Sequence, residues 1–341
     1  MIDKTEKDVM SLWPSNKAPL VSIRCTTFNQ EKTIARALDG FLEQTTNFGF
    51  EIIVHDDASS DSTAKIIREY EEKFPNVVKP IYETENQYSK KDGSLTRAIN
   101  PKLSGKYIAT CEGDDFWCDS RKLQMLVDFL ETNDDYSACA HNTELVSEIS
   151  HKKKILYSLE NGDVTLSDIL SGNDFHYSSI VCRREFWFNR PSFCFKSGSG
   201  DYSLKAFLSL NGRIHRFGDV MSVYHYGGES SWTKRNYNDP EIRIRNYMKV
   251  VFFLTEANKW SSYKYDDVFK EAIFRYLYRS FLDLGQFRIL KSAPYSSFWK
   301  SESMKDKIKH IFYYLKDLNK KFDKKSLIEE LNRVENDNTK N

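Results

Sequence analysis

The sequence has no long apolar segment. Its longest uninterrupted apolar run covers only residues 250–254, whereas a helix that spans a bilayer needs about 20 apolar residues. The first 17 residues, MIDKTEKDVMSLWPSNK, are polar and of mixed charge, and they lack the apolar core of a secretory signal peptide. We therefore expect a cytoplasmic protein that does not cross a membrane.

An excess of charge of one sign is also missing. Lys plus Arg number 50 and Asp plus Glu number 49, which leaves a net charge of +1 at pH 7. This balance argues against a nucleic-acid-binding surface that covers the whole protein, and we expect no nucleic acid partner. None of the six cysteines forms a CxxC pair, so we expect buried free thiols in a reducing compartment.

What the sequence does contain is enough apolar material for a packed core. Hydrophobic residues make up 40% and charged residues 29% of the 341 residues, which is typical of a globular chain and not of a disordered one. Aromatic residues reach 14%. They suit platforms for sugar rings, but they suit an ordinary core as well.

From residue 19 the pattern alternates between strands and helices. Short β-branched runs at 21–27, 51–55, 77–82 and 106–111 predict strands, and amphipathic stretches at 31–45 and 62–74 predict helices between them. A helix after the fourth strand is predicted from the apolar spacing of Leu123, Leu126, Val127 and Leu130. Further short strands are expected at 137–141 and 179–182. Such alternation predicts an α/β fold with a mixed, mostly parallel, Rossmann-like sheet sandwiched by helices.

Ligands of such sheets bind at the carboxyl ends of the strands. Three polar segments, 26–29, 56–57 and 112–115, each come directly after a predicted strand. The last of them places Glu112, Asp114 and Asp115 within four residues. Like charges at this spacing suit a hard cation such as Mg²⁺ or Mn²⁺, although an exposed acidic turn before a helix explains them too.

Three segments together resemble the nucleotide-binding half of glycosyltransferase family 2. They are SIRCTTFNQE at 22–31, IVHDDASSDS at 53–62 and CEGDDFW at 111–117. The resemblance covers roughly residues 19–232. It implies a GT-A-type fold and an inverting, UDP-sugar-dependent glycosyltransferase.

The resemblance also assigns roles to residues at the strand ends. Residues that would bind the base and ribose of the UDP donor are Thr26, Phe28, Glu31 and Asp57. Glu112, Gly113 and Asp114 take the place of the family's D-x-D element, with Asp114 at the metal-binding position for Mn²⁺ or Mg²⁺, and Asp115 is a further candidate cofactor-binding residue. Glu112 replaces the usual first Asp and reaches one methylene further.

Two later segments extend the resemblance. In GSGDYSL at 198–204, Asp201 takes the place of the general base of inverting members, although an N-cap Asp after a glycine-rich turn also fits this pattern. In VMSVYHYGGES at 220–230, His225 stands where relatives often carry an Arg, and it is a second candidate metal ligand. The segment 177–183, YSSIVCR, corresponds to one that lines the sugar pocket in relatives.

We predict four regions along the chain. A polar segment at 1–18 precedes a catalytic GT-A domain at 19–235, which is followed by a helical extension at 236–334 and a flexible tail at 335–341. Within the extension, residues 304–325 carry an apolar stripe with eight Lys and three Asp. This basic amphipathic stretch either packs on the catalytic domain or makes a peripheral contact with an anionic membrane.

These expectations combine into one functional prediction. The chain would move a single sugar from a UDP-sugar to a glycan or lipid-linked acceptor, in bacterial surface-polysaccharide or glycoconjugate assembly. The alternative is a nucleotide-sugar-binding or scaffold protein with the same fold and little turnover. A nucleotidyltransferase is disfavoured, because residues 26–31 lack the glycine-rich basic loop that holds a triphosphate.

Overall fold

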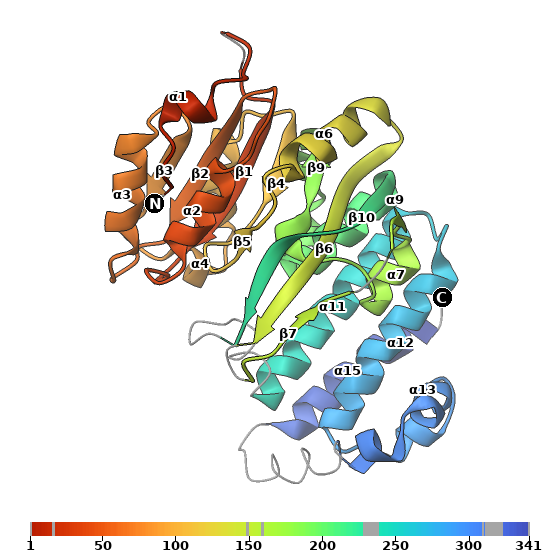
Figure 1. The fold of residues 1–341 in the computed structure, drawn as a ribbon. Coiled ribbons are helices and arrows are strands. Elements are labelled where there is room, and N and C mark those ends of the chain that lie inside the picture. Colours follow the sequence, from red (N-terminus) through yellow and green to blue (C-terminus); the bar gives the residue numbers. More distant parts are fainter. Residues whose placement is uncertain are drawn as a thin grey trace. The chain divides into compact units, whose positions relative to one another are not determined.

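The computed structural model describes residues 2–15, 18–147, 150–157, 160–227, 239–308, 310 and 323–339. The chain forms two compact units (Figure 1). The first unit combines Met1–Arg190 with Phe207–Ser230, and the second combines Pro191–Ala206 with Ser231–Asn341. Helix α9 (Gly200–Asn211) contributes its first turns to the second unit and its last turns to the first.

The first unit is built on one mixed sheet in the order β3-β2-β1-β4-β9-β6-β10-β5. Its first four strands are parallel, and Figure 1 shows them side by side. Strand β9 then pairs antiparallel with both of its neighbours. The strands of this sheet, with the short β7 and β8 beside it, are β1 (Val21–Thr27), β2 (Phe50–Asp56), β3 (Val78–Tyr82), β4 (Tyr107–Thr110), β5 (Phe116–Trp117), β6 (Tyr136–Ser147), β7 (Lys153–Ile155), β8 (Gly162–Asp163), β9 (Val181–Arg183) and β10 (Arg213–Tyr226).

The core of this unit lies between the sheet and its helices. Ile23 and Ile52 of neighbouring strands are fully buried together with Leu38 and Phe41 of α2. A side chain on Gly40 of α2 would place its Cβ 2.5 Å from the Trp117 carbonyl oxygen, so glycine lets this helix pack against β5. The helices of the first unit are α1 (Glu6–Val9), α2 (Ile34–Leu42), α3 (Thr63–Lys73), α4 (Gln87–Lys90), α5 (Ser94–Ile99), α6 (Lys122–Thr132), α7 (Leu166–Ser171) and α8 (Arg184–Phe188), with 3₁₀ turns η1 (Asn100–Lys102) and η2 (Tyr177–Ser179).

The predicted fold class is confirmed: a mixed, largely parallel sheet is covered by helices, and a helical region follows it. The strands and helices predicted between residues 19 and 132 fall within a few residues of the observed ones. Strand β6 instead continues six residues beyond the predicted 137–141, and the sequence did not predict β10. One expectation about the thiols is wrong. Five cysteines are buried, but Cys118 is exposed, because it follows the two-residue strand β5 at the end of the sheet.

The described part of the second unit is helical. Its long helices α11 (Pro240–Trp260) and α12 (Asp266–Asp283) pack against one another, and Tyr202 of α9 contacts the rings of Phe253 and Tyr276. Helix α15 extends to Thr339, so it overlaps the tail that the sequence predicts from residue 335. The elements of this unit other than α9 are η3 (Ser192–Lys196), α11 (Pro240–Trp260), α12 (Asp266–Asp283), η4 (Ile289–Lys291), α13 (Ser296–Ser301) and α15 (Lys324–Thr339).

Candidate active site

The loops that follow β1 and β2 are joined by hydrogen bonds. The Asn29 N–H donates to Ser59 Oγ at 2.9 Å, and the Ser60 N–H donates back to Asn29 Oδ1 at 2.8 Å. The carboxylate of Glu31 accepts the Ser62 N–H at 2.9 Å. Asn29 itself adopts a left-handed backbone with φ of 51°, which Asn tolerates better than most residues. The carboxyl ends of the two strands therefore form one connected surface.

Three of the predicted nucleotide-binding residues lie on or beside this surface. Thr26 is half-buried near the end of β1, and the Phe28 ring is 38% exposed. Asp57 is buried, and its carboxylate accepts the N–H groups of Gln87 at 2.6 Å and Tyr88 at 3.0 Å. These bonds fix the Asp57 side chain. The exposed ring of Phe28 is a flat apolar face of the kind on which a nucleotide base stacks.

The acidic turn, residues 112–115, lies directly after β4. Glu112 is exposed, Asp114 is half-buried and Asp115 is buried. The Gly113 N–H donates to the Thr26 carbonyl at 3.0 Å. A Cβ on Gly113 would lie 2.6 Å from Gln30 Oε1 and 2.9 Å from Thr27 Oγ1. The glycine therefore allows the turn to sit against the end of β1, and it brings the third polar segment to the other two.

Asp115 faces inward, where neighbouring groups hold it. Its Oδ1 accepts the backbone N–H of His225 at 3.2 Å, and its Oδ2 lies 3.6 Å from His176 Nδ1. Burial raises the pKa of Asp115 well above its usual range, and the negative charges of Asp114 and Glu112 raise it further. The structure thus places Asp115 as an internal support of the turn, while Glu112 and Asp114 reach solvent.

His225 approaches the acidic turn with its backbone. Its ring packs edge-on against Phe116 at 5.7 Å and lines a groove of about 440 Å³, together with Arg36 and Glu144. The ring of the preceding Tyr224 instead stacks on His176 at 4.2 Å. That His225 binds the metal remains a prediction.

His176 and Lys122 are two residues of this region that the sequence did not single out. His176 Nδ1 lies 2.8 Å from Ser178 Oγ, and the Ser178 carbonyl accepts bonds from Trp117 Nε1 at 2.9 Å and from Lys122 Nζ at 3.3 Å. Lys122 is fully buried with its ammonium 3.8 Å from the Trp117 ring centroid. Burial lowers the pKa of Lys122 to about 7. This network links helix α6 to the segment that holds His176 beside Asp115.

The carboxylates of the turn fit a hard divalent cation. Among the described residues, no three His, Cys, Asp or Glu side chains come together as a ready-made metal site. Mg²⁺ in particular needs few protein ligands, because one or two carboxylates and substrate phosphates complete its coordination. Asp114 and Glu112 supply such carboxylates at the edge of the sheet.

Asp201 lies in the second unit, at the beginning of α9. Its Oδ1 accepts a hydrogen bond from Ser199 Oγ at 2.7 Å, and its side chain is exposed. Gly198 precedes it with φ of 72°, a backbone that favours glycine. The turn that the sequence predicts before this helix is therefore present.

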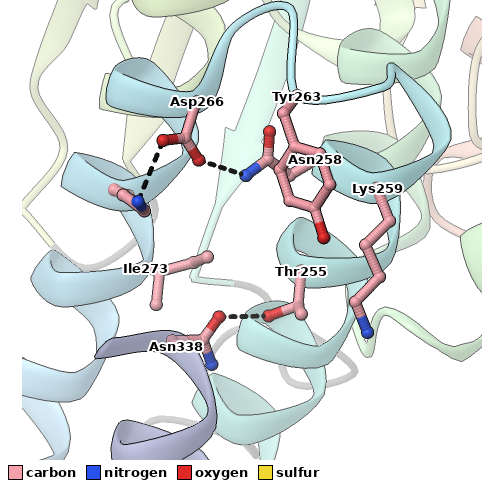
Figure 2. Close-up of a pocket in the computed structure, with 8 residues that line it drawn as sticks. Thr255, Asn258, Lys259, Tyr263, Asp266, Ile273 and Asn338 are labelled. Atoms are coloured by element: carbon pink, nitrogen blue, oxygen red, sulfur yellow. Dashed lines mark hydrogen bonds and ion pairs between the residues drawn. The ribbon is translucent and has the colours of Figure 1, made fainter. Parts of the chain in front are cut away.

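A small cavity in the second unit is too small to bind a substrate. Figure 2 shows its lining residues from α11, α12 and α15. Asn258 Nδ2 donates to Asp266 Oδ1 at 2.9 Å, and Thr255 Oγ1 donates to Asn338 Oδ1 at 2.9 Å. The volume of about 20 Å³ holds about one water molecule. These polar groups tie the three helices together.

The amphipathic stretch predicted at 304–325 falls largely outside the described residues. Met304 and Ile308 at its start are 70% and 61% exposed. None of the helices in the described ranges is both long and apolar enough to span a bilayer.

Comparison with known proteins identifies the domain. Residues 22–185 match the family model for glycosyl transferase family 2. The chain is 31% identical over 219 residues to the uncharacterized protein Rv1520 of Mycobacterium tuberculosis, covering 62% of this chain and 60% of that relative. It is 28% identical over 145 residues to the Escherichia coli UDP-Glc:alpha-D-GlcNAc-diphosphoundecaprenol beta-1,3-glucosyltransferase WfgD, covering 41% of this chain and 54% of that one.

Solved structures share the fold. Residues 1–349 of Staphylococcus aureus TarS, in complex with UDP-GlcNAc, superpose with a TM-score of 0.58 at 16% identity, covering 86% of this chain and 79% of that one. The mannosyltransferase PcManGT from Pyrobaculum calidifontis, in complex with GDP-Man and Mn²⁺, gives a TM-score of 0.52 at 16% identity, covering 90% and 89%. With its GT-A-type fold, the chain therefore carries a glycosyl transferase family 2 domain at residues 22–185.

Proposed function

We propose that this protein is an inverting glycosyltransferase that moves one sugar from a UDP-sugar to a hydroxyl group of a glycan or lipid-linked acceptor. The observation that carries the proposal is the convergence of three polar segments at one edge of the sheet. The acidic turn, residues 112–115, is hydrogen-bonded to the end of β1, and the loop after β1 is hydrogen-bonded to the loop after β2. A relative named as a glucosyltransferase that uses UDP-Glc and a diphosphoundecaprenol-linked acceptor supports the same class.

The nucleotide would bind across the loops after β1 and β2. The Phe28 ring offers a stacking face for the base, and the fixed Asp57 lies at the end of the neighbouring strand. Thr26 and Glu31 complete the set that the family resemblance assigns. Because the Glu31 carboxylate already accepts the Ser62 N–H, we assign it to shaping the loop that receives the nucleotide.

The diphosphate would lie at the acidic turn. Asp114, with Glu112 beside it, would hold a Mn²⁺ or Mg²⁺ ion, which when bound stabilises negative charge on a departing diphosphate. The Gly113 backbone packs tightly against β1 between these two residues. Asp115 supports the turn from the inside through the His225 N–H.

Asp201 would act as the general base. Its carboxylate accepts the proton of the acceptor hydroxyl as the oxygen of that hydroxyl bonds to the anomeric carbon. The bond from this carbon to the diphosphate oxygen breaks on the opposite face, and the nucleoside diphosphate leaves with the electron pair. A single displacement of this kind inverts the configuration.

The test is a nucleotide-release assay with a panel of UDP-sugars and candidate acceptors, using wild type and Asp201→Asn. Loss of a general base lowers turnover by about 10²- to 10⁴-fold, while thermal stabilisation by UDP should remain. Turnover of Asp201→Asn within a few-fold of wild type would exclude Asp201 as the base. Stabilisation by UDP-sugars with no release from any of them would favour the binding-protein alternative.

A further inference from the structure

Arg24 is a buried cation in the middle of β1. Its side chain is 8% exposed, and its neighbours Ile23 and Cys25 are fully buried on the other face of the strand. Arg24 Nη1 donates to the Tyr177 hydroxyl at 3.1 Å, and the guanidinium lies 5.6 Å from the Trp187 ring centroid. Its Nε is buried without a hydrogen-bond partner.

Within the described residues, no carboxylate forms an ion pair with this guanidinium. None of the ion pairs found there includes Arg24, and burial raises the pKa of Tyr177, so its phenol stays neutral beside the guanidinium. A buried charge without a partner is costly, and buried charges in proteins are normally paired. Arg24 therefore has the properties of an anion-binding residue without its anion.

The position of Arg24 relates this anion to the donor. Arg24 precedes Thr26 by two residues and lies on the same face of β1. At about 3.3 Å per residue, the two Cα atoms are about 7 Å apart, so Arg24 lies that far from Thr26 toward the start of the strand. Its partner Tyr177 is fixed at β4, since Thr110 Oγ1 donates to the Tyr177 carbonyl at 2.5 Å, two residues before Glu112. The anion would thus lie one step inward from the edge where the diphosphate is proposed to bind.

The chemistry of the cluster indicates a carboxylate. A guanidinium presents paired N–H donors that match the two oxygens of a carboxylate. Arg190 adds a second cation to the same aromatic ring, 4.3 Å from the Trp187 centroid. We propose that Arg24 selects a donor whose sugar carries a carboxylate, a hexuronic acid, and that it binds this group together with the Tyr177 hydroxyl. This inference rests on the proposed glycosyltransferase function.

The experiment compares UDP-sugars that differ only in oxidation at C6: UDP-glucuronic acid against UDP-glucose, and UDP-galacturonic acid against UDP-galactose. Wild type should prefer the acidic member of the pair that it uses. In Arg24→Met, kcat/KM for the acidic donor should fall by about 10- to 100-fold relative to the neutral one. The control is Arg68→Met. Arg68 is an exposed arginine of α3 that lies over the Tyr82 ring, and this variant should keep the wild-type ratio of kcat/KM between the acidic and the neutral donor.

A second measurement separates a ligand-binding role from a structural one. Because Arg24→Met removes an unpaired buried charge, the variant without ligand should unfold at a temperature equal to or above that of wild type. The acidic donor should raise the unfolding temperature of wild type more than the neutral donor does, and this difference should be lost in Arg24→Met. A lower unfolding temperature, combined with an unchanged donor ratio, would show that Arg24 only supports Tyr177 and Trp187.

Other outcomes also decide the matter. If kcat/KM of Arg24→Met fell equally for the acidic and the neutral donor, Arg24 would contact the diphosphate and the inference would be wrong. A wild-type preference for the neutral donor would also overturn the inference. If no donor of either pair is turned over while another UDP-sugar of the panel is, this inference fails and the proposed function stands; if no UDP-sugar of the whole panel is turned over, the proposed function itself fails.

Discussion

Lys122 provides a test of the packing behind the acidic turn, residues 112–115. The side chain is fully buried, its ammonium lies 3.8 Å from the Trp117 ring centroid, and it donates to the Ser178 carbonyl. Met has a similar length and no charge, so Lys122→Met should fill the same space. The Ser178 carbonyl would still accept the Trp117 Nε1–H at 2.9 Å.

The magnitude follows from the pKa of Lys122, which burial lowers from 10.5 to about 7. Between these values the unfolded chain binds nearly one proton more than the folded protein. Each pH unit in this range therefore adds up to about 1.4 kcal/mol to the free energy of unfolding. Below pH 7 Lys122 is charged in the folded protein, and burying this charge lowers the free energy of unfolding by its full amount. As the pH rises above 7 the folded protein loses this proton, and the free energy of unfolding increases. From pH 7 to pH 9 this single group should stabilise wild type by about 2 kcal/mol.

The assay is urea unfolding of wild type and Lys122→Met at pH 7, 8 and 9. In the difference between the two free energies of unfolding, the contributions of most other titrating groups cancel. From pH 7 to pH 9 this difference should shift by about 2 kcal/mol in favour of wild type. Lys65→Met, which changes an exposed lysine of α3, should show no such shift. A difference that stays constant with pH would refute the reasoning about Lys122.

Two further predictions concern the carboxyl edge of the sheet. Gly113→Ala should lower the free energy of unfolding by about 1–3 kcal/mol, because its Cβ would lie 2.9 Å from Thr27 Oγ1. Gly162→Ala is the matched control, since the space around its Cβ is open. Equal effects of the two substitutions on the free energy of unfolding would contradict the close packing of the turn. Phe28→Ala should weaken UDP binding roughly tenfold, as measured by calorimetry. The free energy of unfolding should not change, because the ring is exposed. An unaltered affinity for UDP would remove Phe28 from the nucleotide site.

Much of the fold could be predicted because the local patterns agree with the tertiary structure. β-branched runs such as 21–27 form strands whose buried faces pack on amphipathic helices. The rule that ligands bind at strand ends then selected the segments around Thr26, Asp57 and Asp114. Their proximity follows from the order of β2, β1 and β4 in the sheet, which short crossover connections favour.

The remaining features depend on contacts that are distant in sequence. Arg24 and Lys122 look like ordinary charged residues in a sequence, and only the packing of Tyr177 and Trp117 around them reveals their burial. The direction of the His225 ring depends on the register of β10, which shifts twice between Phe217 and Ser222. Each such irregularity alters which side chains face which side of a sheet, and no local pattern announces it.

The most direct test of the central claim is the metal dependence of donor turnover. Nucleotide release from the preferred donor is measured across a Mn²⁺ titration for wild type, Asp114→Ala and Asp128→Ala, the last of which removes an exposed carboxylate of α6. We expect saturable activation by Mn²⁺ in wild type and Asp128→Ala, and release at least 100-fold lower in Asp114→Ala, on the order of the loss of a group that stabilises transition-state charge. Release that is independent of the metal, or equal in all three proteins, would contradict the assignment of the acidic turn as the catalytic metal site.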